Sequence, residues 1–240
     1  MKKIVLASIL FLSLFCILSG CVDDIEENIN PEPEIVEEGI KFLALGDSYT
    51  AGAGIDSIGS WPVQLVNRIK KDSIIVDTLA VIAKTDQATS NLLNAIERTE
   101  LIDFNLVSLQ IGVNNQFRGS DFSIFETEFN ALLDTAFNIT GSNEQIFVLS
   151  IPDYGVTPFG AENAETIASE IDIYNNYIQE QCELRNILFI NVTDISRELG
   201  DGSLALAPDK LHPSAYQYGE WVKIIFPEVL QLVDQMKNTP

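Results

Sequence analysis

The feature that most constrains this fold is a regular alternation, from residue 41 onward, of continuous apolar runs and amphipathic segments. The apolar runs lack the every-second-residue alternation of a strand with one face in water, so they are typical of strands covered on both faces. We expect five such strands, at residues 41–46, 73–82, 106–112, 145–151 and 187–192. This order predicts one α/β domain, a three-layer α/β/α sandwich around a five-stranded, mainly parallel sheet.

Helical periodicity fills the intervals between these strands. The expected helices span residues 60–71, 89–98, 123–137, 165–184 and 213–236. Ser60 is placed to cap the first of them, with Pro62 in its first turn. Pro227 lies inside the last one, so we expect that helix to bend or break there.

The first 40 residues differ in composition from the rest of the chain. Lys2 and Lys3 precede an apolar stretch, residues 4–18, which ends in Leu-Ser-Gly-Cys at residues 18–21. This end resembles the lipobox of bacterial lipoproteins, which implies cleavage after residue 20 and lipidation of Cys21. The alternative is an ordinary secretory signal followed by a chance cysteine. A lipidated Cys21 predicts attachment to the bacterial cell envelope, at the outer membrane or the cell surface.

The charge distribution limits the kinds of partner that the protein can bind. Residues 22–40 carry eight acidic side chains and no basic one, as expected of a solvated tether. We therefore divide the chain into a signal peptide (1–20), an acidic tether (21–40) and one domain (41–240). That domain holds 27 acidic and 12 basic side chains, a formal charge of −15. This excess disfavours nucleic acid and anionic lipid as partners, so we expect membrane attachment through Cys21 only.

The residue inventory argues against a metal or other cofactor. Cys182 is the only cysteine and His212 the only histidine after residue 21, too few for a disulfide or a zinc site. No phosphate-cradling glycine motif is present either. We expect no cofactor, and we expect Cys182 to pack as a small apolar side chain on a helix.

Polar residues with catalytic potential follow the predicted strands. Ser48 lies in Gly-Asp-Ser-Tyr-Thr-Ala-Gly (residues 46–52), directly after the first strand, where ligands of parallel sheets bind. A serine nucleophile needs a general base, and His212 is the only histidine. Asp209, three residues earlier, can orient that imidazole. Taken singly, each residue has an ordinary interpretation, as a turn serine or a surface histidine.

Together, the 46–52 block, Gly112-Val113-Asn114 and Asp209-Lys210-Leu211-His212-Pro213 resemble the SGNH hydrolases, the GDSL family of esterases and lipases. The resemblance implies the flavodoxin-like fold of that family. It also implies that Ser48 is the nucleophile, His212 the base and Asp209 its orienting partner. The side-chain amide of Asn114 and the Ser48 N–H would stabilise the oxyanion.

The chain departs from the family pattern at the block that follows the second strand. Asp86 stands where the family has a glycine whose N–H completes the oxyanion hole. The N–H survives this replacement, but the carboxylate could repel the developing charge unless it turns outward. Two further departures, Asn115 for the usual aspartate and Tyr49 for leucine, remove no group that the chemistry needs.

Weaker expectations concern the pocket walls. We expect Asp47, Gly112, Asn115, Arg118 and Tyr154 near the substrate. Arg118 could grip a substrate oxygen or be an ordinary exposed arginine, and Tyr154 could form a substrate platform.

The resulting function hypothesis is a serine ester hydrolase for small acyl esters, including acetyl esters and acetylated glycans. A thioesterase or lysophospholipase for longer acyl chains is the alternative within the enzyme class. A non-catalytic surface-binding lipoprotein on the same fold is the alternative outside it. The sequence does not define the oligomeric state.

Overall fold

The computed structural model describes residues 39–238, and the predicted signal peptide and Cys21 lie outside this range. Five parallel strands form one sheet in the order β2-β1-β3-β4-β5. They are β1 (Ile40–Gly46), β2 (Val76–Ala83), β3 (Leu106–Gln110), β4 (Ile146–Leu149) and β5 (Leu188–Ile190). All five predicted strands are confirmed. β1 starts at Ile40, the last residue assigned to the tether, and that side chain is buried.

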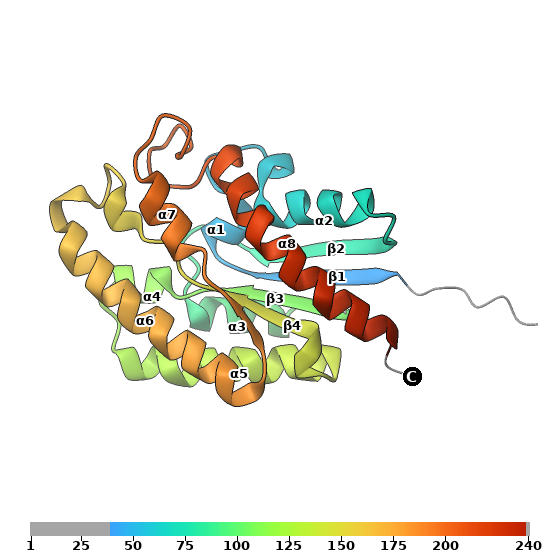
Figure 1. Cartoon of the computed structure of the whole chain (residues 1–240). Helices are drawn as coiled ribbons and strands as arrows, with labels where there is room; N and C mark the ends of the chain where they lie inside the picture. The colour runs from blue at the N-terminus through green and yellow to red at the C-terminus, as the bar shows by residue number, and fades with distance from the viewer. Residues whose placement is uncertain (1–38, 239–240) are drawn as a thin grey trace, which may run out of the picture. The chain divides into compact units, whose positions relative to one another are not determined.

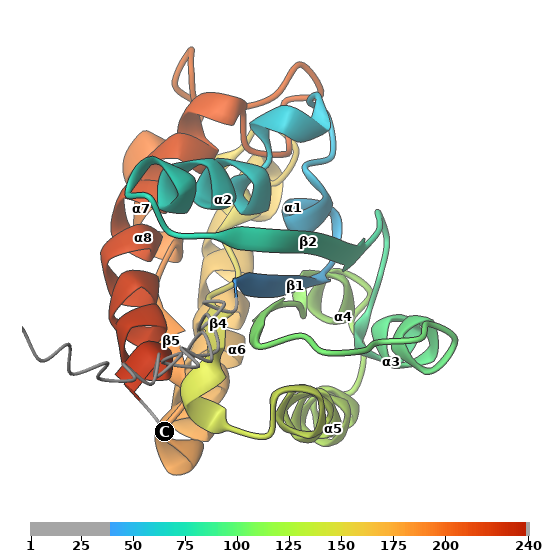
Figure 2. The same ribbon diagram turned by 90° about the vertical axis from the view of Figure 1, so that its right-hand side faces the viewer.

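Helices cover both faces of the sheet (Figures 1 and 2). α2 and α8 pack together on one face, whereas α3, α5 and α6 lie on the other. The longer helices are α2 (Trp61–Lys71), α3 (Thr89–Glu97), α5 (Phe122–Thr140), α6 (Ala164–Arg185) and α8 (Ala215–Asn238). The predicted three-layer sandwich is therefore confirmed.

Short elements lie between the longer ones. They are α1 (Ser48–Ala51), α4 (Val113–Phe117), α7 (Thr193–Leu199) and the 3₁₀ turns η1 (Ser57–Gly59), η2 (Asn143–Gln145), η3 (Tyr154–Val156) and η4 (Ala161–Asn163). Each is too short to show helical periodicity in its apolar residues. Two of them, α1 and α4, carry candidate site residues.

Of the predicted bend or break at Pro227, the break does not occur, because α8 continues through this residue to Asn238. The bend stays a prediction. Ile225 and Val229, on either side of the proline, are fully buried. Burial on both sides anchors the helix across the one backbone hydrogen bond that proline removes.

The core is apolar and continuous from one helical layer to the other. Cys182 is buried on α6, and burial raises the pKa of its thiol to about 12. This confirms its packing as a small apolar side chain. Within residues 39–238, no helix combines the length and the hydropathy that a membrane span requires.

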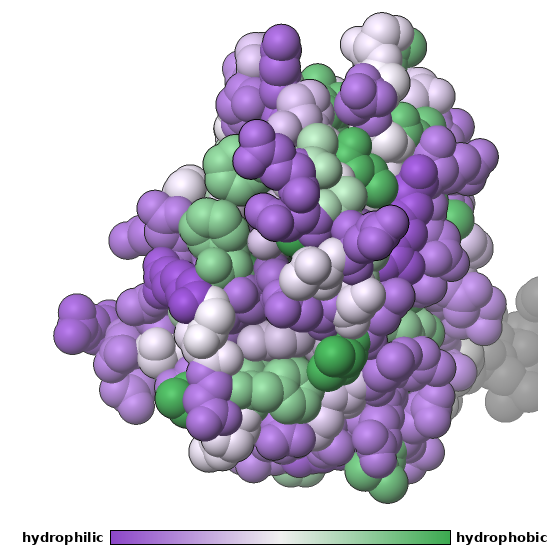
Figure 3. Space-filling model, turned by 90° about the vertical axis from the view of Figure 1, so that its left-hand side faces the viewer, coloured by the Kyte–Doolittle hydropathy of each residue, from purple (hydrophilic) through white to green (hydrophobic). Residues whose placement is uncertain are grey.

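The carboxyl ends of the strands form one face of the domain, which Figure 3 views directly. There α1 follows β1 and α4 follows β3 almost at once. Since β1 and β3 are neighbours in the sheet, this topology brings the segment around Ser48 close to the segment around Asn114.

Candidate active site

Ser48 lies at the turn where β1 becomes α1. β1 ends at Gly46, and the Asp47 side chain caps α1 by accepting the Tyr49 N–H at 3.0 Å. Ser48 is the first helical residue, and an N–H group in the first turn of a helix has no acceptor within the helix. A Cβ on Gly46 would overlap the Thr50 side chain and lie 2.6 Å from the Gln110 carbonyl oxygen. Glycine is therefore required for this tight turn.

The chain brings Ser48, His212 and Asp209 together from distant segments. His212 Nε2 lies 2.9 Å from Ser48 Oγ, and His212 Nδ1 lies 2.8 Å from Asp209 Oδ2. The other carboxylate oxygen, Oδ1, accepts the N–H groups of Leu211 and His212, each at 3.0 Å. With the Nδ1 proton donated to Asp209, Nε2 is left to accept the Ser48 hydroxyl proton.

Two aspartates near Ser48 have opposite electrostatic environments. Burial raises the pKa of Asp47 to about 7, against the lowering effect of backbone hydrogen bonds. Burial also raises the pKa of Asp209, but hydrogen bonds from the His212 ring and from two backbone N–H groups outweigh it. The Asp209 pKa therefore lies below its ordinary value. Asp209 is thus the carboxylate that stays ionised beside the imidazole.

Two residues that the sequence analysis did not assign to the site hold this arrangement. The Tyr49 ring packs edge-on against the His212 ring, with centroids 5.7 Å apart. Gly54, with φ of 82°, lies so close to Asp209 that a Cβ there would overlap Oδ2, the oxygen that faces His212. The glycine-rich stretch after Ser48 was visible in the sequence, but its contact with Asp209 depends on the tertiary fold.

Asn114 and Asp86 line the same pocket as Ser48 and His212. Asn114 Nδ2 donates to the Gln87 carbonyl oxygen at 3.0 Å, which leaves its second amide hydrogen for another acceptor. Asp86 has φ of 61°, in the left-handed region that favours glycine but tolerates aspartate. The replacement of glycine by Asp86 therefore keeps a glycine-like backbone conformation.

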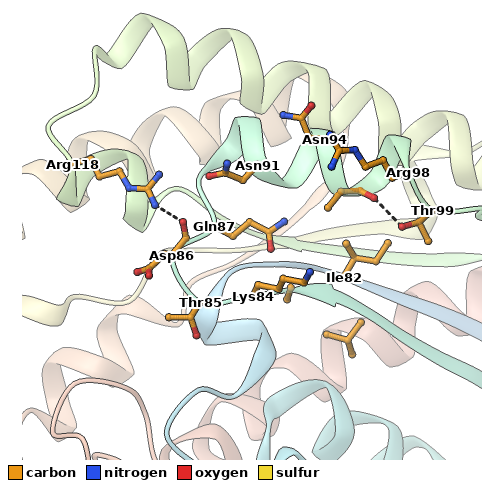
Figure 4. A pocket seen from close by; sticks show the side chains of 13 residues that line it. Ile82, Lys84, Thr85, Asp86, Gln87, Asn91, Asn94, Arg98, Thr99 and Arg118 are labelled. Carbon is orange, nitrogen blue, oxygen red and sulfur yellow. Dashed lines mark hydrogen bonds between the residues drawn. The ribbon is translucent and has the colours of Figure 1, made fainter.

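Arg118 contacts the Asp86 backbone. Its Nη2 donates a short hydrogen bond to the Asp86 carbonyl oxygen, and both side chains are exposed (Figure 4). The guanidinium thus places a positive charge beside the loop that carries the Asp86 carboxylate. The predicted contact of Arg118 with a substrate oxygen remains a prediction.

Three other candidate residues support the local backbone or packing. Asn115 exchanges two hydrogen bonds with Thr89, at 3.1 and 2.7 Å, and does not line the pocket, so its predicted substrate contact has no support here. Gly112 has φ of 128°, and a Cβ would lie 2.8 Å from Phe125. Asp47 caps α1 rather than facing the pocket.

Asp153, after the end of β4, binds groups other than His212. Its Oδ2 pairs with Arg197 at 2.9 Å, and its Oδ1 accepts the Gly155 N–H at 2.8 Å. Asp209 is accordingly the carboxylate that contacts the imidazole.

The pocket in front of Ser48 has a volume of about 260 Å³. One wall consists of three aromatic rings, those of Phe117, Tyr154 and Phe159, whose centroids lie 5.8 to 6.3 Å apart. Tyr154 is buried and donates its hydroxyl to Gln116 at 2.9 Å, whereas Phe117 and Phe159 are more than half exposed. Phe117 and Phe159, which the sequence analysis missed, thus lie beside Tyr154, whose role as a substrate platform remains a prediction.

The described residues contain no cluster of histidine, cysteine, aspartate and glutamate side chains able to hold a metal ion. What the site offers is a serine–histidine–aspartate chain facing amide donors, an arrangement suited to acyl transfer.

Comparisons with known proteins bear on the fold and the family. No curated protein sequence matches the chain. Among solved structures, TesA superimposes with a TM-score of 0.62 at 16% identity over 80% of this chain and 99% of its own. A member of the lipolytic protein G-D-S-L family from Veillonella parvula gives 0.65 at 14% identity over 79% and 97%. Axe2, an acetylxylan esterase from Geobacillus stearothermophilus, gives 0.59 at 18% identity over 81% and 94%.

These structural likenesses establish the fold. The family follows from a sequence match, because residues 44–219, more than half of the chain, fit the model of the GDSL-like lipase/acylhydrolase family. The matched range includes Ser48, Asn114, Asp209 and His212. The chain belongs to the GDSL-like lipase/acylhydrolase family and is a carboxylic ester hydrolase.

Proposed function

We propose that the protein hydrolyses small acyl esters, acetyl esters among them, with Ser48 as nucleophile, His212 as general base and Asp209 as its orienting carboxylate. The observation that carries this proposal is the continuous chain of contacts, 2.9 Å from Ser48 Oγ to His212 Nε2 and 2.8 Å from His212 Nδ1 to Asp209 Oδ2. Both lengths allow direct proton transfer along hydrogen bonds.

Acylation begins when Ser48 Oγ attacks the ester carbonyl carbon. The hydroxyl proton passes to His212 Nε2, and ionised Asp209 stabilises the resulting imidazolium. The tetrahedral intermediate collapses, its C–O bond to the alcohol breaks, and Nε2–H protonates the departing alkoxide. Deacylation repeats the sequence, with water as the nucleophile and Ser48 as the leaving group.

The oxyanion would be stabilised by the Ser48 N–H, the Asp86 N–H and the Asn114 side-chain amide. Such donors act best when they are fixed before the reaction. Asn114 is held by its bond to Gln87, and Arg118 ties the Asp86 carbonyl. The exposure of the Asp86 side chain supports a position in solvent for this carboxylate, where water screens its charge.

The pocket supports a small acyl group. A volume of about 260 Å³ is below the usual range for sites that enclose a drug-sized ligand. The likeness of the fold to an acetylxylan esterase is consistent with an acetyl group, although at 18% identity it carries no specificity.

The exposed phenylalanines favour a second candidate substrate class. Phe117 and Phe159 are 58% and 55% exposed at the pocket mouth, where they could cover part of a longer acyl chain. This would suit a thioesterase or lysophospholipase. p-Nitrophenyl esters of two to twelve carbons, assayed beside acetylated sugars, separate the two classes. A maximum of kcat/KM at two to four carbons supports small esters, and a maximum at eight or more supports the alternative.

The mechanism is tested by labelling and by substitution. Wild-type protein should react with a fluorophosphonate probe and hydrolyse p-nitrophenyl acetate, whereas Ser48→Ala should do neither. His212→Ala should lose at least 10³-fold in kcat. Ser57→Ala, which removes an exposed hydroxyl nearby, is the matched control and should behave as wild type. Retention of labelling in a folded Ser48→Ala variant would disprove the assignment.

We also propose that Cys21 is lipidated and anchors the domain to the cell envelope, at the outer membrane or the cell surface. The support is the sequence Leu-Ser-Gly-Cys after the apolar stretch and the acidic segment that follows it. Expression in a bacterial host with a labelled fatty acid should mark wild-type protein in the membrane fraction. Cys21→Ser should abolish the label and release the protein, and equal labelling of both would disprove the anchor.

A further inference from the structure

A second, larger cavity adjoins the catalytic pocket. We call it the β2–α3 groove, a hollow of about 970 Å³ between the edge strand β2, the loop after it and α3. Its lining includes Lys84, Asp86, Gln87, Asn91, Arg98 and Arg118. Thr85 and Asp86 line both cavities, so the groove begins where the catalytic pocket ends.

The charge of this groove opposes that of the domain. Acidic side chains outnumber basic ones by 27 to 12 in residues 41–240, yet the groove lining has three cations and one carboxylate. Lys84, Arg98 and Arg118 are exposed, and none of the three forms an ion pair with a carboxylate of the described residues. Figure 4 shows Arg118 at one end, Arg98 toward the other and Lys84 between them. Such a row suits a ligand with spaced negative charges.

A buried glutamine gives an independent indication of a ligand. Gln87 is only 5% exposed, and its Oε1 atom has no hydrogen-bond partner within the described part of the chain. Figure 4 shows its amide directed into the groove. An unpaired buried acceptor is costly, and a hydroxyl donor from a ligand would satisfy it. The Asn91 side chain, whose Oδ1 accepts the Ala88 N–H at 3.1 Å, has its NH₂ group left to donate.

We propose that the β2–α3 groove binds the alcohol part of the ester, and that this part is an oligosaccharide bearing carboxylates, such as a chain of uronic acid units. This rests on the proposed hydrolysis at Ser48. Cations spaced along the groove would pair with successive carboxylates, while Gln87 and Asn91 would bond to hydroxyls. Nine of the thirteen lining residues are polar or charged, which fits a sugar chain better than an acyl chain.

The negative charge of the domain means that a preference for an acidic substrate would identify the groove as its source. At a formal charge of −15, the domain as a whole repels an acidic substrate, so any preference for one must come from local contacts. Local pairs at exposed side chains are weakened by salt. The preference should therefore fall when the ionic strength rises.

The test compares two acetylated oligosaccharides of equal length and acetyl content, an oligogalacturonide and a xylooligosaccharide. Wild type should show a kcat/KM about tenfold higher for the acidic one. Lys84→Gln with Arg98→Gln should reduce this ratio to about twofold. Lys70→Gln with Lys71→Gln, which removes two exposed charges from α2, should leave it unchanged. An equal ratio in all three proteins would overturn the subsite.

Two further arms separate the causes of failure. Ser48-dependent hydrolysis of p-nitrophenyl acetate tests the proposed function alone: if it is absent, that function fails, and if it is present without an acidic preference, only the subsite fails. Competition of unacetylated oligogalacturonide against glycerol 3-phosphate tests the source of the anion. Stronger inhibition by the sugar supports the proposal, and stronger inhibition by the phosphate overturns it.

Discussion

The segments that supply the nucleophile and the base are stabilised in different ways. The Ser48 segment, residues 46–54, is continuous with a central strand, and Asp47, Ser48, Tyr49 and Thr50 are all buried. Behind it, Gln110 on β3 accepts hydrogen bonds from Thr50 and Trp61. Residues 46–50 are therefore part of the core.

The His212 segment, residues 205–213, is instead a surface loop held by its own hydrogen bonds. Ala207 N–H donates to the His212 carbonyl oxygen at 2.8 Å, and Asp209 accepts two N–H groups of its own turn. The side chain of Asp209 is 38% exposed, whereas Asp47 is 1% exposed. Because of this difference, we expect substitutions in the His212 segment to lower activity with little effect on stability. Substitutions in the Ser48 segment should lower both activity and stability.

Asp209→Ala should show the largest separation between the two quantities. Without the carboxylate, His212 loses the partner that fixes its tautomer and stabilises its charged form, so kcat should fall by about 10⁴-fold. The free energy of unfolding should change by less than about 1 kcal/mol, because the side chain is exposed. Kinetics with p-nitrophenyl acetate and urea denaturation measure the two effects. Asp201→Ala, in the same exposed region, should change neither, and a destabilisation above 3 kcal/mol for Asp209→Ala would refute the comparison.

Asp47→Asn tests the buried segment through pH. The folded-state pKa of Asp47, about 7, exceeds the ordinary 3.8, so ionisation favours the unfolded state. Its contribution to stability is thus most favourable below pH 4 and declines until pH 7, by about 4 kcal/mol. Asparagine keeps the cap and does not titrate. The stability of the variant relative to wild type should therefore rise by about 4 kcal/mol between pH 4 and pH 8.

Asp121 provides a control of opposite sign. It caps α5 at the surface, and hydrogen bonds from the Ser123 side chain and backbone lower its pKa. Its contribution is present above the unfolded pKa and is lost as pH falls. Asp121→Asn should therefore lose stability relative to wild type as pH rises. Urea denaturation at each pH measures both variants, and slopes of the same sign would contradict the assignment.

The sequence predicts the layers of this fold well, because buried strands and amphipathic helices leave strong patterns. At Pro227 it allows a break that the helix does not have, because Ile225 and Val229 pack on both sides of the proline. It also misses α4, whose position is set by the end of β3 rather than by periodicity.

The site was predictable where chemistry restricts the residue type. A serine nucleophile needs a base, and the only histidine after residue 21 is the obvious candidate. In the structure, His212 Nε2 lies 2.9 Å from Ser48 Oγ. Residues that act through shape were not predictable. Phe117, Phe159 and Gly54 contribute through tertiary contacts, and no local pattern marks them.

Asn114→Ala tests the proposed hydrogen-bond donor that faces the Ser48 segment from α4. Loss of one oxyanion donor should lower kcat by about 10²- to 10³-fold, with a smaller change in KM. The substitution also removes the bond to the Gln87 carbonyl, so a purely structural role predicts a loss of stability instead. Asn115→Ala is the contrasting variant, because its amide bonds Thr89 and should affect stability more than kcat. Equal kinetic effects of the two variants would remove the distinction between them.

Gly54→Ala acts at the contact between the two segments and should give the smallest effect. A Cβ there would overlap Asp209 Oδ2, so the carboxylate must shift away from His212, and kcat should fall about tenfold. The left-handed backbone also disfavours alanine by about 1–2 kcal/mol. Gly119→Ala separates the two causes, because its φ is 61° and no atom lies within 4 Å of the added Cβ. Both variants should lose similar stability in urea denaturation, but only Gly54→Ala should lose kcat. A similar kinetic loss in Gly119→Ala would mean that backbone strain, not the displacement of Asp209, controls the rate.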